Sequence, residues 1–132
     1  MKLISILHVD DDEIDRESFA REMAANNVVN NIYSAADGEE ALLLIRSGKV
    51  ERPFMVLLDL KMPRMDGLDF LAELRKDAAF KAVPVIVLTS SNNPADLMAA
   101  HQLGISGYIL KPVAMANFSK TVAAMGQWWS LW

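Results

Sequence analysis

The chain alternates short apolar runs with longer segments in which apolar residues recur at helical spacing. Runs this short, separated by helical segments, are typical of parallel strands that are buried on both faces of a sheet. The pattern predicts five strands, at residues 3–9, 31–35, 54–59, 84–89 and 107–110. The intervening segments predict five helices, at residues 12–26, 38–47, 66–74, 94–104 and from 115 to the end.

Residues that favour helix ends support these boundaries. Asp12 and Asn93 can accept hydrogen bonds from the first free backbone N–H groups of the helices that follow them. Pro94 suits the first turn of a helix, and Gly104 suits the position just after a helix end. Five strand–helix units in succession predict an α/β fold, an open doubly wound parallel sheet with helices on both faces.

Polar groups stand where four of the apolar runs end. Asp10 and Asp11 follow the first run, Asp59 ends strand 54–59, Thr89 ends strand 84–89, and Lys111 follows strand 107–110. Sheets of this kind bind their ligands beyond the carboxyl ends of the strands, at the switch point in strand order. Hard oxygen ligands suit Mg²⁺. The sequence therefore predicts a place where a divalent cation and a phosphoryl group bind together.

Each of these residues also has an ordinary structural interpretation. Asp10 and Asp11 could place negative charge at a helix N-terminus, where it is favourable. Thr89 could be a β-branched strand residue, and Lys111 could be a solvated lysine at a strand end. Asp59 is more informative, because it interrupts an apolar stretch in which an unpaired carboxylate is costly. A carboxylate beside Mg²⁺ can attack phosphorus and form an acyl phosphate.

Composition narrows the setting. The 132 residues fit one domain spanning 1–132, with no output domain after the last helix, and a hydrophobic content of 52% argues against disorder. The absence of cysteine excludes a disulfide framework and a thiolate metal site. No apolar run approaches the ~20 residues of a membrane span. With a net charge of −4 and no basic block, nucleic-acid binding is not supported, and we expect a cytoplasmic protein.

Four motifs carry the predicted site: Val9-Asp10-Asp11-Asp12, residues 58–67, Leu88-Thr89-Ser90-Ser91, and residues 107–112. Together they resemble the receiver domain of two-component response regulators, and the resemblance covers essentially the whole chain. It implies a flavodoxin-like fold of five strand–helix units with strand order 2-1-3-4-5. It also implies a signalling protein that accepts a phosphoryl group, rather than an enzyme.

The resemblance assigns a role to each residue near the acceptor. Asp59 would take a phosphoryl group from a phosphohistidine of a sensor histidine kinase, with Mg²⁺ as cofactor. Asp11 is similar to the family's direct Mg²⁺ ligand, and Asp10 to a ligand that acts mainly through water. The backbone carbonyl of Lys61 would complete the protein ligands.

Three further residues resemble the family's switch. Thr89 and Lys111 look like the residues that bind the phosphoryl group. Tyr108 is similar to the aromatic residue that turns inward when the threonine moves. The Lys111–Pro112 bond is a candidate for the cis isomer, which occurs in only about 5–6% of X-Pro bonds in folded proteins.

The signal is expected to leave the chain through protein contacts, since no output domain follows. A downstream protein target is implied, or alternatively an intermediate step in a phosphorelay. The segment Gly126-Gln127-Trp128-Trp129 looks like stand-alone receivers partnered with bacteriophytochrome-type kinases. Trp128 lies beside the apolar stripe of the last helix and would extend a face formed with helix 94–104 and strand 107–110. That face would form a homodimer or bind the kinase, unless Trp128 folds back as packing.

Two other classes of function are disfavoured. An aspartate-nucleophile phosphohydrolase needs a second carboxylate two residues after the nucleophile, and the chain has Lys61 there. A flavin-binding protein needs a phosphate-cradling loop after the first strand, and the chain has three aspartates there.

Several residues outside the motifs are expected to be structural. His8 and His101 lack metal-ligand spacing, which favours structural or surface positions. Met23, Met98 and Met115 lie on plausible core faces of their helices.

Overall fold

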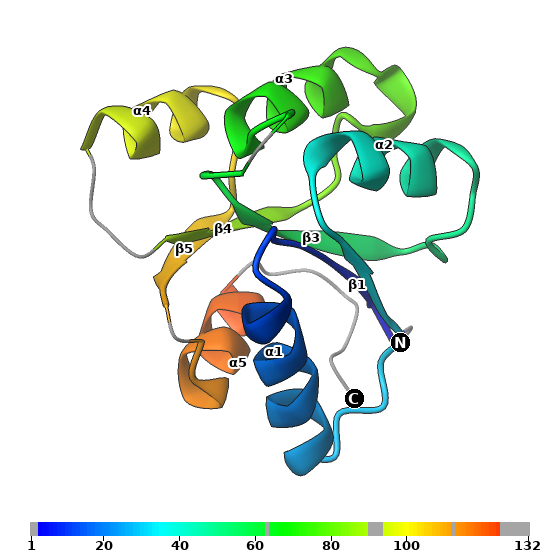
Figure 1. Cartoon of the computed structure of the whole chain (residues 1–132), viewed down its shortest axis with the longest axis vertical. Coiled ribbons are helices and arrows are strands. Elements are labelled where there is room, and N and C mark those ends of the chain that lie inside the picture. Colours follow the sequence, from blue (N-terminus) through cyan, green and yellow to red (C-terminus); the bar gives the residue numbers. More distant parts are fainter. Residues whose placement is uncertain (1–2, 63, 90–93, 112, 125–132) are drawn as a thin grey trace.

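The computed structural model describes residues 3–62, 64–89, 94–111 and 113–124 (Figure 1). Four predictions fall outside these residues. They are the helix cap at Asn93, the isomer of the Lys111–Pro112 bond, the continuation of the last helix beyond residue 124, and the position of Trp128.

One sheet of five parallel strands forms the centre of the molecule, in the order β2-β1-β3-β4-β5. The strands are β1 (Ser5–Val9), β2 (Ile32–Ala35), β3 (Phe54–Asp59), β4 (Val85–Thr89) and β5 (Gly107–Leu110). The α/β fold and the strand order 2-1-3-4-5 are confirmed. Three strands, β1, β2 and β4, begin one or two residues later than the apolar pattern predicts, because an apolar run can start before the ladder of hydrogen bonds does.

Helices cover both faces of the sheet. On one face lie α2 (Gly38–Arg46), α3 (Gly67–Lys76) and α4 (Pro94–Gln102), and on the other lie α1 (Glu13–Ala25) and α5 (Met115–Ala124) (Figure 1). A short 3-10 helix, η1 (Ala78–Phe80), follows α3 and is not among the predicted elements. The Arg52–Pro53 peptide bond is cis. None of the helices in the described ranges is both long enough and apolar enough to cross a membrane.

Aspartates begin three of the helices. Asp12 caps α1 as predicted, and its side chain accepts a hydrogen bond from the backbone N–H of Ile14 at 2.9 Å. Asp37 and Asp66 cap α2 and α3 through the backbone N–H groups three residues further on. Each cap satisfies a donor that the helix itself leaves free.

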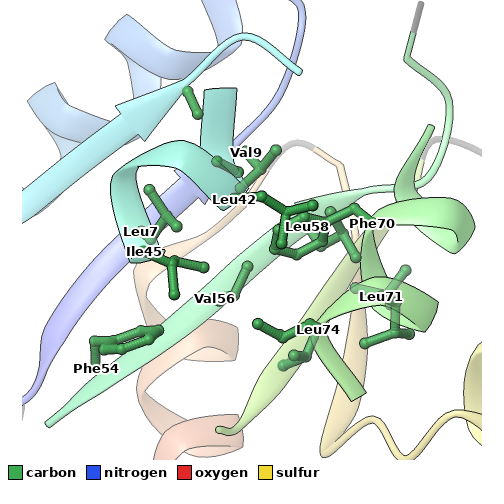
Figure 2. Close-up of a cluster of buried hydrophobic side chains, with 14 of the residues drawn as sticks. Leu7, Val9, Leu42, Ile45, Phe54, Val56, Leu58, Phe70, Leu71 and Leu74 are labelled. Carbon is green, nitrogen blue, oxygen red and sulfur yellow. The ribbon is translucent and has the colours of Figure 1, made fainter. Parts of the chain in front are cut away.

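The core consists of two layers, one on each face of the sheet. Successive side chains of a strand point to opposite faces, so β3 contributes to both layers. Val56 and Leu58 pack under α2 and α3, whereas Met55 and Leu57 pack against α1 and α5. Figure 2 shows the first layer, which these residues form with others of α2 and α3: Leu42, Ile45, Phe70, Leu71 and Leu74.

The methionine predictions are only partly right. Met23 is fully buried, and Met115 packs against the layer under α1 and α5. Met98, however, is 65% exposed, so its assignment to the core is wrong. Residues 97–100 of α4 are all apolar and point in different directions around the helix, so their spacing alone does not identify its buried face. The fully buried residue of this helix is Ala100.

Candidate functional site

The register of β1 and β3 places two of the predicted acids side by side. Val9 of β1 is in register with Leu58 of β3, so the next residues, Asp10 and Asp59, are neighbours at the carboxyl end of the sheet. Carboxylate oxygens of Asp10, Asp11 and Asp59 all lie within 4.8 Å of one another. Asp59 thus meets Asp10 and Asp11, which lie 49 and 48 positions earlier in the chain, in one acidic cluster.

The cluster is held by backbone hydrogen bonds. Asp10 is fully buried and Asp59 is 8% exposed, whereas Asp11 is exposed. The backbone N–H of Asp12 donates to Oδ1 of Asp10 at 3.0 Å. In the same way, the backbone N–H of Lys61 donates to Oδ1 of Asp59 at 3.1 Å. These hydrogen bonds fix the orientation of both carboxylates through Oδ1. Oδ2 of each carboxylate lies near the Lys111 ammonium.

Lys111 supplies the positive charge of the cluster. Its Nζ lies 2.8 Å from Oδ2 of Asp10 and 3.2 Å from Oδ2 of Asp59. A third carboxylate, Oδ2 of Asp15 in α1, lies 2.9 Å from the same Nζ. Asp15 is not among the predicted site residues, because an acid in the first turn of a helix has an ordinary explanation. Its one sequence signal is its position, one helical turn after the acidic motif.

Burial and neighbouring charge both act on Asp59. Burial raises the pKa of its carboxyl above the ordinary value, and the charge of Asp10 adds to this rise. The Lys61 N–H and the Lys111 ammonium oppose the rise without cancelling it. An ionised Asp59 therefore destabilises the metal-free fold at any pH above this raised pKa.

Asp10 and Lys111 are shifted toward their charged forms. Burial acts to raise the pKa of Asp10, but the neighbouring His8 and Lys111 outweigh it and hold the pKa below its usual range. For Lys111, burial acts to lower the pKa, but the surrounding carboxylates raise it above the ordinary lysine value. Both groups therefore carry full charge at neutral pH.

The donor set fits Mg²⁺. All three acids of the cluster offer hard carboxylate oxygens. Oδ2 of Asp10 is fully buried, and the Lys111 ammonium at 2.8 Å offsets its charge. Carboxylate oxygens gathered this closely suit a divalent cation that keeps some of its water.

The other predicted residues surround the cluster. Asp59 is in register with Leu88 of β4, so Thr89 lies at the next position, and its carbonyl accepts a hydrogen bond from the Lys111 backbone N–H at 2.8 Å. Tyr108 of β5 is 47% exposed. The side chain of Lys61 leaves the cluster and forms an ion pair with Asp96 of α4, at 3.0 Å.

Comparison with known proteins identifies the family. Residues 6–123 match the family model of the response regulator receiver domain. The probable methanogenesis regulatory protein FilR2 of Methanothrix harundinacea is 31% identical over 130 residues, which cover 96% of this chain and 84% of that protein. Response regulator Rcp1 of Synechocystis sp. is 30% identical over 128 residues, which cover 94% of this chain and 87% of that protein.

A solved structure agrees with these matches. The bacteriophytochrome response regulator AtBRR superimposes with a TM-score of 0.83 at 33% identity, covering 100% of this chain and 99% of that one. Fold, strand-end chemistry and sequence similarity all agree, and this chain belongs to the response regulator receiver domain family.

Proposed function

We propose that Asp59 accepts a phosphoryl group from the phosphohistidine of a sensor histidine kinase and that the protein signals in this phosphorylated form. The observation that carries the proposal is the acidic cluster at the carboxyl end of the sheet, with the Lys111 ammonium in contact with Asp59. Membership of the receiver family supports it.

In the proposed transfer, a carboxylate oxygen of Asp59 forms a bond to phosphorus while the phosphorus–nitrogen bond of the phosphohistidine breaks. The electron pair of that bond goes to the imidazole nitrogen. Asp10, Asp11, Asp59 and the Lys61 carbonyl would hold Mg²⁺, which when bound offsets the negative charge of the phosphoryl oxygens and the carboxylates. Lys111 would pair with a phosphoryl oxygen, and the Lys61 N–H fixes the orientation of Asp59.

A small phosphodonor tests this assignment. Incubation with acetyl phosphate and Mg²⁺ should add one phosphoryl group to the wild-type protein, and the Asp59→Asn variant should show only background modification because it lacks the accepting oxygen. Intact mass spectrometry measures the addition, and borohydride reduction marks the modified residue. Modification that persists in Asp59→Asn, or that proceeds equally with excess chelator, would contradict the proposal.

The variant must be folded for this comparison to count. Because the pKa of Asp59 is raised in the fold, its ionised form costs stability at neutral pH, and asparagine removes that cost. Asp59→Asn should therefore melt at or above the wild-type temperature in metal-free buffer at neutral pH. The difference should shrink as the pH falls through the folded-state pKa and the wild-type carboxyl becomes protonated.

We also propose that Thr89 and Tyr108 transmit the phosphorylated state. Thr89 lies one residue beyond the β4 partner of Asp59. Its hydroxyl would move to a phosphoryl oxygen on Asp59. Tyr108, half-exposed on the neighbouring strand β5, would then turn inward. A ligand shifts such an equilibrium only by its differential affinity for the two forms, so the unphosphorylated protein should already sample the active form.

Beryllofluoride, which imitates the phosphoryl group, tests the switch. With Mg²⁺ it should shift the amide NMR signals of α4 and β5 in the wild-type protein. The Thr89→Ala variant should still accept a phosphoryl group from acetyl phosphate but should lose most of these shifts. A Thr89→Ala spectrum that responds as the wild type does would remove Thr89 from the proposal.

The proposed output surface lies on α4, β5 and α5. Met98, Tyr108 and Leu110 expose large apolar side chains there, which favours a protein partner over solvent. We propose that this face binds a downstream protein or a second copy of the chain, which light scattering with and without beryllofluoride would detect. The likeness to a bacteriophytochrome response regulator supports a phytochrome-type or hybrid kinase as the donor, acting in the cytoplasm. Onward transfer in a phosphorelay is the alternative output.

A further inference from the structure

We infer that Asp15 is a positioning residue that holds the Lys111 ammonium so that it does not compete with Mg²⁺ for the same carboxylate oxygens. The inference rests on the proposed function, since it concerns metal binding at the phosphoryl-accepting cluster. It adds to the site a carboxylate that none of the receiver motifs described above contains.

The geometry sets up this competition. The two closest contacts of Lys111 within the acidic cluster are Oδ2 of Asp10 and Oδ2 of Asp59. Both carboxylates also belong to the group whose oxygens lie within 4.8 Å of one another. An ammonium that stays on these oxygens occupies ligand positions that a divalent cation needs, and the two cations repel each other at such a distance.

Asp15 offers Lys111 another partner. Its Oδ2 lies 2.9 Å from the Lys111 Nζ, and Asp15 is not part of the metal-ligand group found among the described residues. Its carboxylate can therefore retain the ammonium when the Asp10 and Asp59 oxygens turn to a metal. Lys111 then keeps a charged hydrogen bond, and its burial remains compensated.

The surrounding space allows this movement. Asp15 and Lys111 both line a cavity of about 230 Å³, which also reaches Asp10 and Ser18. The lysine side chain ends in a compact ammonium on a flexible stem. The ammonium, already 2.9 Å from Oδ2 of Asp15, has room in this cavity to move away from Asp10 and Asp59.

The simpler explanation is that Asp15 only favours the N-terminus of α1. The first turn of that helix holds two acids, Glu13 and Asp15. Glu13 is exposed, and no contact with Lys111 is found for it in the described part of the chain. Glu13→Gln therefore removes the same charge from the same helix end and serves as the matched control.

Magnesium affinity tests the inference directly, without reference to phosphorylation. Titration of MgCl₂ into the full chain, followed by NMR or calorimetry, should show Asp15→Asn binding about fivefold to twentyfold more weakly than wild type, within the range of coupling found between contacting charged groups. Glu13→Gln should stay within about twofold, as expected for a screened surface charge. Asp15→Glu, which keeps the carboxylate, should recover most of the loss.

A double-variant cycle separates positioning from direct action on the metal. With Lys111→Met as the background there is no ammonium to position, so adding Asp15→Asn should change the Mg²⁺ affinity by less than about twofold. A full loss in that background, or wild-type affinity in Asp15→Asn itself, would overturn the inference and leave the proposed function standing. A wild-type protein that binds no Mg²⁺ would overturn both.

Discussion

Replacing Gly67 with alanine should cost the protein about 3 kcal/mol of stability and displace the residue that we propose as the phosphoryl acceptor. A Cβ at position 67 would lie 2.5 Å from the carbonyl oxygen of Asp59 and 2.6 Å from the Cα of Leu60. Both are backbone atoms, so neither can rotate away as a flexible side chain would. The backbone N–H of Gly67 also donates to the Leu60 carbonyl at 3.1 Å, which docks α3 directly against the end of β3.

Urea denaturation measures the loss of stability, and the rate of modification by acetyl phosphate measures the displacement of Asp59. Gly48→Ala is the matched control. Gly48 has a φ of +77° and open space around its Cβ position, so alanine there meets backbone strain of about 1–2 kcal/mol but no clash. Equal stability of the two variants, with unchanged modification in Gly67→Ala, would contradict this prediction. It would mean that the backbone of Asp59 and Leu60 moves to accommodate the added Cβ at little cost in stability.

Phe118→Ala should destabilise the fold by about 3–5 kcal/mol, the usual range for a fully buried phenylalanine. Phe118 of α5 has no solvent exposure and meets Phe19 of α1 edge to face, with ring centroids 5.5 Å apart. Phe19 in turn contacts the His8 ring of β1 at 4.9 Å. The three rings connect α1 and α5 to the sheet. Removing the Phe118 ring therefore leaves a cavity between α1 and α5.

Thermal and urea denaturation of Phe118→Ala measure this effect, and Phe80→Ala provides the comparison. Phe80 of η1 is only partly buried, so the same truncation there should cost roughly half as much. A loss in Phe118→Ala no larger than in Phe80→Ala would mean that α5 contributes little to the described core.

The strand ends could be predicted from sequence because two rules of local geometry agree there. A short apolar run fixes where a strand lies, and the first polar residue after it must appear at the edge of the sheet. Asp10, Asp59 and Lys111 follow such runs, and the structure brings them together. The strand order came from the family resemblance, because periodicity alone does not determine which strands are neighbours.

The side-chain partners of Asp15 and Lys61 could not be predicted from the sequence. The pairing of Asp15 with Lys111 joins residues 96 positions apart, and it depends on how α1 lies across the sheet. The Lys61 ammonium pairs with Asp96 of α4, and the sequence around Lys61 does not indicate this partner. The spacing predicts Met98 in the core, but four consecutive apolar residues in α4 fit more than one buried side, and the structure exposes Met98. In each case the deciding contact belongs to the tertiary structure.

The separation between the buried acidic cluster and the exposed face at Met98, Tyr108 and Leu110 has an evolutionary consequence. Asp10 and Asp59 are enclosed by packing and held by backbone N–H groups, so most substitutions near them disturb folding and chemistry together. Residues of the exposed face carry few such constraints, and substitutions there are usually nearly neutral for stability. If the proposed functions hold, descendants of one ancestral gene can change partners through substitutions on this face while they keep the proposed phosphoryl chemistry at the buried cluster.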